Sequence, residues 1–260
     1  MPVVMQHPRG TFCWPELSTS DTAGAKAFYR ALFGWEADDV PMDASYSYTL
    51  LRKGSHQVGG LSALDPRFHP PGTPPHWFSY VATEDADATA ASAEKLGGKV
   101  MAPPFDVMDF GRMAVIQDTV GALFGVWQTK KHSGAGLLGE PGSLAWTQLN
   151  AAKPAAAVPF YAGLFGWTHR EDPMPWGGTY VTFLAGEERR GGGMPMPPGV
   201  NVPAHWLPYF AVDDVDAVAA KAGTLGGKPH VPPTDIPGTG RFAVLADPQG
   251  AAFAIVKFNA

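Results

Sequence analysis

Two short apolar segments near the start of the chain contain a carboxylate and an imidazole that could move a proton. Glu16 lies two residues after Trp14 in FCWPEL, and His76 opens the segment HWFSYVAT. Because side chains alternate between the faces of a strand, Trp14 and Glu16 share one face, as do His76, Phe78 and Tyr80. Burial among apolar neighbours raises the pKa of a carboxyl toward the range of a general base. Glu16 and His76 are therefore candidate catalytic residues.

A second copy of these positions follows about half a chain later and consists of Trp146, Gln148, His205 and Tyr209. Glutamine replaces the carboxylate in this copy, which favours acid–base chemistry in the first copy only. The aromatic residues of both copies also suit the walls of small-molecule pockets. The candidate ligand-binding residues are Trp14, Phe78, Tyr80, Trp146, Gln148, His205 and Tyr209.

The polar residues also have structural interpretations. Glu16 could pair with Arg112 or be exposed at a sheet edge. His76 and His205 each follow a proline-rich stretch, where an imidazole can form a hydrogen bond at the start of a strand. These interpretations remain beside the catalytic one.

Arg112 and Arg241 stand in equivalent GR dipeptides, each before a segment that reads as a strand. We expect them to hold the loops that contain Asp106 and Asp235 through salt bridges. This is favoured over a role as substrate clamps.

The chain consists of two homologous halves. FYRALFGW at 28–35 recurs as FYAGLFGW at 160–167, and the similarity continues to the ends of both halves. We predict a first domain at 8–130, a linker at 131–141 and a second domain at 142–260. The paired aromatics and the closing Gly-Trp are expected to pack in the core.

Each half contains two rounds of a strand, a helix and further strands. Asp21 or a neighbouring Ser or Thr can cap the first helix, whose apolar residues recur at helical spacing until Gly34. A second helix is predicted from about residue 87 to 96, and Pro159 should delay or bend the third. The sequence thus predicts four βαβββ modules of the α+β class.

Composition limits the function. The formal net charge is −5, with only 19 Lys and Arg, which argues against a nucleic-acid partner. The sequence contains no run of about 18 apolar residues and no leader segment, so we expect no membrane contact and a cytoplasmic location. Cys13 is the only cysteine, which excludes an internal disulfide.

Four βαβββ modules with FYxxLFGW after the first strand and FAVLADPQGAAFAIV at the end resemble the vicinal oxygen chelate (VOC) superfamily. This superfamily includes glyoxalase I, bleomycin resistance proteins and extradiol dioxygenases. Within it, the chain is similar to two-unit actinobacterial proteins related to a mycobacterial culture-filtrate antigen. The resemblance implies two tandem domains with cupped mixed sheets. It leaves open whether modules pair within a half or across halves.

In metal-dependent members of this superfamily, the ligands lie on the first and last strands of the modules. The resemblance places those positions on Trp14, Trp146, Phe78, Leu207, Gly125 and Ala254. None has a donor side chain suited to a cation, so we expect no metal and no cofactor. A displaced site built from Glu16 and His76, or from Gln148 and His205, would have only two ligands.

Three functions remain. The first is metal-independent binding of an apolar or aromatic small molecule, as in sequestration or resistance. The alternative is a lyase or isomerase that uses Glu16 and His76. Metal-dependent glyoxalase or dioxygenase chemistry is ranked third because it depends on fold analogy alone. The duplication predicts a monomer that mimics a dimer of single-unit relatives.

Overall fold

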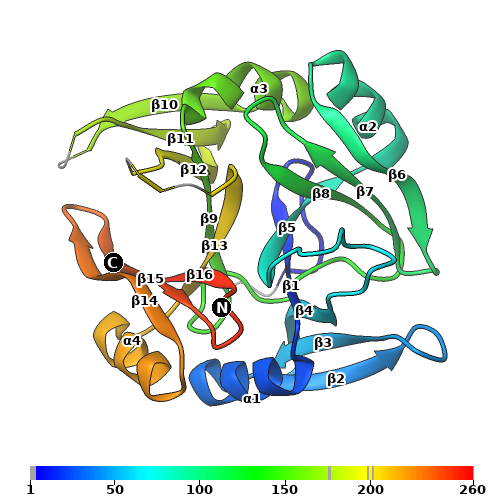
Figure 1. Cartoon of the computed structure of the whole chain (residues 1–260). Helices are drawn as coiled ribbons and strands as arrows, with labels where there is room; N and C mark the ends of the chain where they lie inside the picture. Colours follow the sequence, from blue (N-terminus) through cyan, green and yellow to red (C-terminus); the bar gives the residue numbers. More distant parts are fainter. Residues whose placement is uncertain (1–3, 175–176, 198, 201, 260) are drawn as a thin grey trace.

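The chain folds into four modules, each with a strand, a helix and three strands (Figure 1). The computed structural model describes residues 4–174, 177–197, 199–200 and 202–259. The first module comprises β1 (Phe12–Thr19), α1 (Thr22–Phe33), β2 (Glu36–Pro41), β3 (Ser47–Lys53) and β4 (His56–Ala63). The second comprises β5 (His76–Thr83), α2 (Ala86–Lys95), β6 (Lys99–Val107), β7 (Gly111–Gln117) and β8 (Leu123–Thr129).

The second half repeats this order. Its first module comprises β9 (Leu144–Ala151), the 3₁₀ helix η1 (Pro154–Ala157), α3 (Val158–Phe165), β10 (Thr168–Pro173), β11 (Thr179–Ala185) and β12 (Glu188–Pro195). Its second comprises β13 (His205–Ala211), α4 (Val215–Thr224), β14 (Lys228–Ile236), β15 (Gly240–Ala246) and β16 (Ala252–Phe258). The predicted α+β class with four βαβββ modules is confirmed.

Local sequence signals set the helix ends. The side chain of Asp21 caps α1 by accepting a hydrogen bond from the amide of Gly24, and Gly34 ends the helix in the left-handed conformation. Pro154 opens a 3₁₀ turn in the third module, so α3 begins only at Val158. The late start predicted from Pro159 is confirmed, because a proline fits the first turn of a helix but not its interior.

Modules pair within each half, which answers the question that the repeat left open. β1 lies antiparallel to β5, while β4 and β8 extend the sheet in parallel on either side. The second half has the same antiparallel seam between β9 and β13. The two halves join into one continuous sheet where His205 of β13 pairs with Leu123 of β8.

The helices, in contrast, pack across the halves. α1 shares a buried apolar cluster with residues of the fourth module, including Phe210 and Phe253. α3 shares another cluster with the second module, including Ile116 and Phe124. Figure 1 shows the same arrangement, with α1 beside α4 and α2 beside α3. The interface between the halves is therefore made of helices and the backs of the sheets.

The tyrosine of the repeated motif forms a polar contact inside this interface. The hydroxyl of Tyr29 donates to Asp247 over 3.1 Å and accepts from the indole N–H of Trp77 over 2.9 Å. Tyr161 repeats the arrangement in the other half, with 2.8 Å to Asp118 and 2.8 Å from the indole of Trp206. The motif thus packs in the core, as predicted, and each copy also forms a hydrogen bond to the opposite half.

One strand position differs from the expectation. The alternation on β1 predicts that Phe12 shares the face of Trp14, but the pairing of β1 with β5 shifts register between them. The centre of the Phe12 ring instead lies 4.8 Å from the ring centre of Trp206, in the core between the halves. A bulge adds one residue to the strand and so reverses the direction of the side chains before it.

Within the described residues, no helix combines the length and the apolar composition that a membrane crossing requires.

The Tyr29 network predicts a measurable loss of stability. Tyr29→Phe removes the partner of a buried indole N–H and of a buried carboxyl oxygen. We expect the free energy of unfolding to fall by about 1–3 kcal/mol, measured by urea denaturation. Tyr46→Phe, which removes one hydrogen bond with Ser62 at a partly exposed tyrosine, is the control and should cost less, at most about 1 kcal/mol. Equal losses in the two variants would contradict this assignment.

Candidate functional site

The seam between β1 and β5 forms the floor of a concave face in the first half. Glu16 pairs with Phe78 across the seam and Trp14 pairs with Tyr80, so all four side chains lie on one face. We call this face the first-half cup; it is lined by Trp14, Glu16, Tyr48, Leu50, Phe78, Tyr80, Met113 and Trp127. Tyr48, Phe78 and Met113 are partly exposed, so the cup is open to solvent.

A short hydrogen-bond chain crosses the cup. The indole N–H of Trp14 donates to the hydroxyl of Tyr48 over 2.8 Å, and that hydroxyl donates to Oε2 of Glu16 over 2.7 Å. Tyr48 was not identified from the sequence. The repeat in the sequence could have identified it, because Tyr180 occupies the equivalent position in the second half. The Tyr180 hydroxyl accepts a hydrogen bond from the indole of Trp146 over 2.8 Å.

Glu16 is a carboxylate with hydroxyl partners. Burial raises its pKa above the ordinary value, and hydrogen bonds from Tyr48 and Tyr80 oppose this rise by stabilising the charged form. The Tyr80 hydroxyl also lies 3.9 Å from the sulfur of Met113. Because a thioether sulfur is a weak acceptor, the hydroxyl forms its stronger hydrogen bond with the Glu16 carboxylate. Glu16 as a residue is partly exposed. A carboxylate with a raised pKa is a candidate general base.

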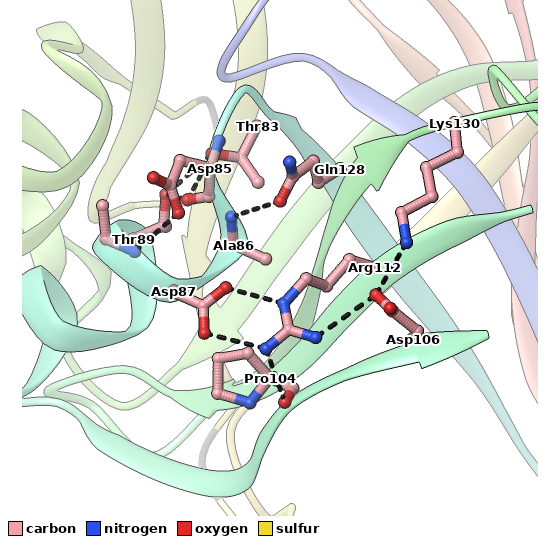
Figure 2. Close-up of polar contacts among 11 residues, drawn as sticks. Thr83, Asp85, Ala86, Asp87, Thr89, Pro104, Asp106, Arg112, Gln128 and Lys130 are labelled. Carbon is pink, nitrogen blue, oxygen red and sulfur yellow. Dashed lines mark hydrogen bonds and ion pairs between the residues drawn. The ribbon is translucent and has the colours of Figure 1, made fainter. Parts of the chain in front are cut away.

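Arg112 does not reach Glu16. Figure 2 shows its guanidinium between two aspartates, with 2.6 and 2.8 Å to Asp87 and 3.2 Å to Asp106. Lys130 adds a second ion pair to Asp106 at 2.9 Å. The predicted salt bridges are confirmed, and Arg241 repeats them with Asp235 and Asp216. Asp106 and Asp235 lie on strands β6 and β14, however, and not in loops. These exposed pairs hold β6 and β14 to the neighbouring helices.

His76 lies at the start of β5, at one end of the cup. Its Nδ1 is 2.9 Å from the carbonyl oxygen of Pro74, and its ring centre is 5.8 Å from that of His69. Burial lowers the pKa of His76, and the neighbouring imidazole adds to this effect. The hydrogen bonds among the described residues do not join His76 to Glu16. The strand-start interpretation of His76 therefore fits the geometry, and a catalytic role stays a prediction.

The second half contains a related but closed polar network. Gln148 donates from Nε2 to Oδ1 of Asn150 over 2.8 Å, and Nδ2 of Asn150 lies 3.2 Å from Nε2 of His205. His205 also contacts the carbonyl of Pro203 at 2.9 Å, as His76 does with Pro74. Gln148 is 5% exposed, whereas Glu16 is partly accessible. The copy with glutamine thus pairs these polar side chains with one another.

Tyr209 and Tyr180 complete this second concave face. Burial raises the pKa of Tyr180 to about 12 and that of Tyr209 further. Both phenols are therefore neutral at physiological pH. Together with Trp146 they give the second half an aromatic face on which Gln148 stands in place of a carboxylate.

The residues around the first-half cup do not fit a metal. Gly125, on the last strand of the second module, has its side-chain space filled by the ring of Tyr80. Gly60, on the last strand of the first module, is likewise in contact with the Tyr48 hydroxyl. In the described part of the chain, no three His, Cys, Asp or Glu residues converge as a metal site would require. A carboxylate at residue 125 would therefore have to displace Tyr80.

Segment 131–141 contacts two of the side chains that line the cup. The ring of His132 meets the indole of Trp14 edge-on with ring centres 4.5 Å apart, and its carbonyl accepts from the indole of Trp127 over 2.8 Å. Burial lowers the pKa of His132 to about 4, so the imidazole is neutral. The sequence contained no repeat signal for this residue, because the second half has no counterpart to it.

Two surface hollows of about 390 and 460 Å³ lie outside the cup. The first is lined by the N-terminal arm at 6–9 and by residues 82–84 and 128–129. The second lies at the C-terminal end, around residues 235–241 and 257–259. Neither contains one of the predicted site residues.

The chain is similar over nearly its whole length to proteins from Mycobacterium and Streptomyces. The chain is 43% identical to the Mycobacterium tuberculosis protein named "Putative glyoxylase CFP32", over 99% of this chain and 98% of that protein. It is 35% identical to the anthracycline biosynthesis protein DnrV of Streptomyces peucetius, over 96% and 94% of the two chains.

Solved structures share the fold. The Mn(II)-bound glyoxalase of Novosphingobium aromaticivorans matches with a TM-score of 0.65 at 18% identity, over 95% of this chain and 82% of that one. The 2,3-dioxygenase LapB of Pseudomonas sp. KL28 matches with a TM-score of 0.68 at 13% identity, over 99% and 96%. The family model described as Glyoxalase/Bleomycin resistance protein/Dioxygenase superfamily matches residues 11–126 and 143–255, so the chain belongs to this superfamily.

Proposed function

We propose that the first-half cup binds an apolar or aromatic small molecule without a metal ion. The observation that carries this proposal is the aromatic floor and wall, in which Trp14, Tyr48 and Tyr80 surround a single carboxylate. Partly exposed ring surface on a concave sheet is typical of a small-molecule site, with a few polar groups that orient the ligand.

Metal independence is supported by the side chains at the superfamily's ligand positions. Trp14 and Phe78 offer no suitable donor, and the space beside Gly125 is filled by Tyr80. A divalent cation would need three or more oxygen or nitrogen donors there. The cup would thus use ring faces and the Glu16 carboxylate where relatives of the superfamily use a bound ion.

The class of ligand is supported by the relatives. Two of them, from Streptomyces peucetius and Streptomyces sp. strain C5, are named anthracycline biosynthesis proteins and share 35% and 34% of their residues with this chain. A planar polycyclic ring matches the cup because aromatic faces stack on flat rings. We therefore favour a polycyclic aromatic ligand.

Acid–base catalysis is the second candidate. The raised pKa of Glu16 and its hydrogen bond from Tyr48 favour it, because a carboxylate held in one orientation can accept a proton from a bound substrate. His76 would then contact the substrate at the end of the cup. Such a lyase or isomerase would operate in the first half only, since Gln148 cannot replace the base.

Ligand binding should depend on the first half. We expect Phe78→Ala to weaken the binding of quinizarin, a dihydroxyanthraquinone, by about tenfold, because it removes a partly exposed ring from the cup floor. Equilibrium dialysis measures the affinity. Trp146→Ala, at a partly exposed aromatic residue of the second concave face, should leave it unchanged. Equal effects of the two variants, or no binding to the native protein, would refute the proposal.

Purified protein should contain no stoichiometric metal. Elemental analysis after expression in metal-supplemented medium checks this, and about one equivalent of bound transition metal would contradict the proposal.

The close packing at Gly125 gives a further prediction. Gly125→Ala places a methyl group against Tyr80 and should lower the free energy of unfolding by about 1–3 kcal/mol. Gly136→Ala is the control, because its nearest neighbour is 3.6 Å away. Thermal or urea denaturation compares the two, and a loss of similar size in both variants would show that residue 125 is not closely packed.

If a substrate is turned over, Glu16→Gln should abolish turnover and leave quinizarin affinity within about threefold. The rate should fall as pH drops, beginning above the range of an ordinary glutamate, because the pKa of Glu16 is raised and the base must be deprotonated. Tyr48→Phe removes a hydrogen bond to the charged form and should move this fall to higher pH. An unchanged pH profile would exclude Glu16 as the base.

A further inference from the structure

Glu16 is a carboxylate without a cationic partner in the described part of the chain. Its hydrogen-bond partners are the hydroxyls of Tyr48 and Tyr80, which burial keeps neutral. Three arginines of the first half are already paired with acidic residues at its surface: Arg52 with Asp38, Arg67 with Asp65, and Arg112 with Asp87. The charge in the cup is therefore available to a ligand.

The rings around Glu16 suit a positive charge. Trp14 and Tyr80 are buried beside Glu16, whereas Tyr48 and Phe78 are partly exposed at the cup. Phe78 meets Tyr80 edge-on with ring centres 5.1 Å apart. The face of an aromatic ring carries partial negative charge and attracts cations within about 6 Å. Nearby, on the loops around β3 and β4, the guanidinium of Arg67 already lies 5.5 Å from the ring centre of Tyr46.

The second half shows what happens when the carboxylate is absent. Gln148 stands at the position of Glu16 and donates its amide hydrogen to Asn150. The Trp146–Tyr180 hydrogen bond is retained at 2.8 Å, which equals the Trp14–Tyr48 distance. The two concave faces thus share the tryptophan–tyrosine pair but differ in charge and in Leu207, which stands where the first half has Phe78. Selection for a cation therefore belongs to the first half.

Building on the proposed function, we propose that the first-half cup selects an aromatic organic cation, such as a protonated amine or a charged nitrogen heterocycle on a planar ring system. Glu16 supplies the counter-charge, and the faces of the surrounding rings stabilise the rest of the cation. A neutral ring of the same shape would contact the same surfaces but leave the carboxylate without an opposite charge.

Two probes of matched shape test this proposal. N-methylquinolinium carries a positive charge, and methylnaphthalene is its neutral counterpart with a similar outline. We expect the native protein to bind the quinolinium at least about tenfold more tightly in equilibrium dialysis at low ionic strength. Quinizarin binding, measured in parallel, reports whether the cup accepts aromatic ligands at all.

Glu16→Gln should remove most of this preference and leave methylnaphthalene binding unchanged. The variant is expected to fold, because the second half accommodates glutamine at the same position beside its own Trp–Tyr pair. Glu94→Gln, at an exposed residue of α2, removes the same formal charge away from the cup and should retain the full preference.

The outcomes separate this proposal from the one on which it depends. Equal binding of the two probes, or a preference that survives Glu16→Gln, would overturn cation selection. Quinizarin binding without quinolinium binding would also overturn it while leaving the proposed function in place. Failure of all three ligands to bind would refute both.

Discussion

The antiparallel seam between β1 and β5 determines both faces of the first half. On the concave face it places Glu16 opposite Phe78, and on the convex face it places Leu17 opposite Trp77. The indole of Trp77 donates to Tyr29, whose hydroxyl bonds to the other half. A slip of one residue would exchange the two faces and break both arrangements together. The candidate site and the interface between the halves therefore depend on one strand register.

The repeated aromatic motif belongs to that interface. Each helix lays its aromatic face on its own sheet and directs a tyrosine hydroxyl to a buried aspartate of the opposite half, Asp247 or Asp118. Burial raises the pKa of both aspartates, and the hydrogen bonds that they accept oppose this rise. The motif tryptophans add further contacts across the boundary, from Trp35 to the carbonyl of Gly142 and from Trp167 to that of Gly10. This explains why the chain contains the motif twice, since each copy secures one side of a pseudo-symmetric pair.

Most of the fold could be predicted because the repeat confirmed each pattern a second time. β2 was not located, since its residues 36–41 form an exposed acidic edge strand without apolar alternation. Phe12 was misplaced because a bulge is not visible in a period-two pattern. In the candidate site, the sequence identified the residues of the cup floor. It did not identify Tyr48, because Tyr48 lies 32 residues from Glu16 on another strand. Pairing within or across halves could not be decided, since the repeat is compatible with both.

The difference between the two concave faces lies in what one side chain can donate. An amide at residue 148 both donates and accepts, so it bonds to Asn150 and closes a network that ends at His205. A carboxylate at residue 16 only accepts, and Ser18, the counterpart of Asn150, is engaged instead with His69 at 3.2 Å. The first half therefore retains an acceptor toward the cup that its own residues leave partly accessible. In a duplicated chain that repeats the tryptophan–tyrosine pair in both halves, this acceptor is a feature on which selection for a ligand can act.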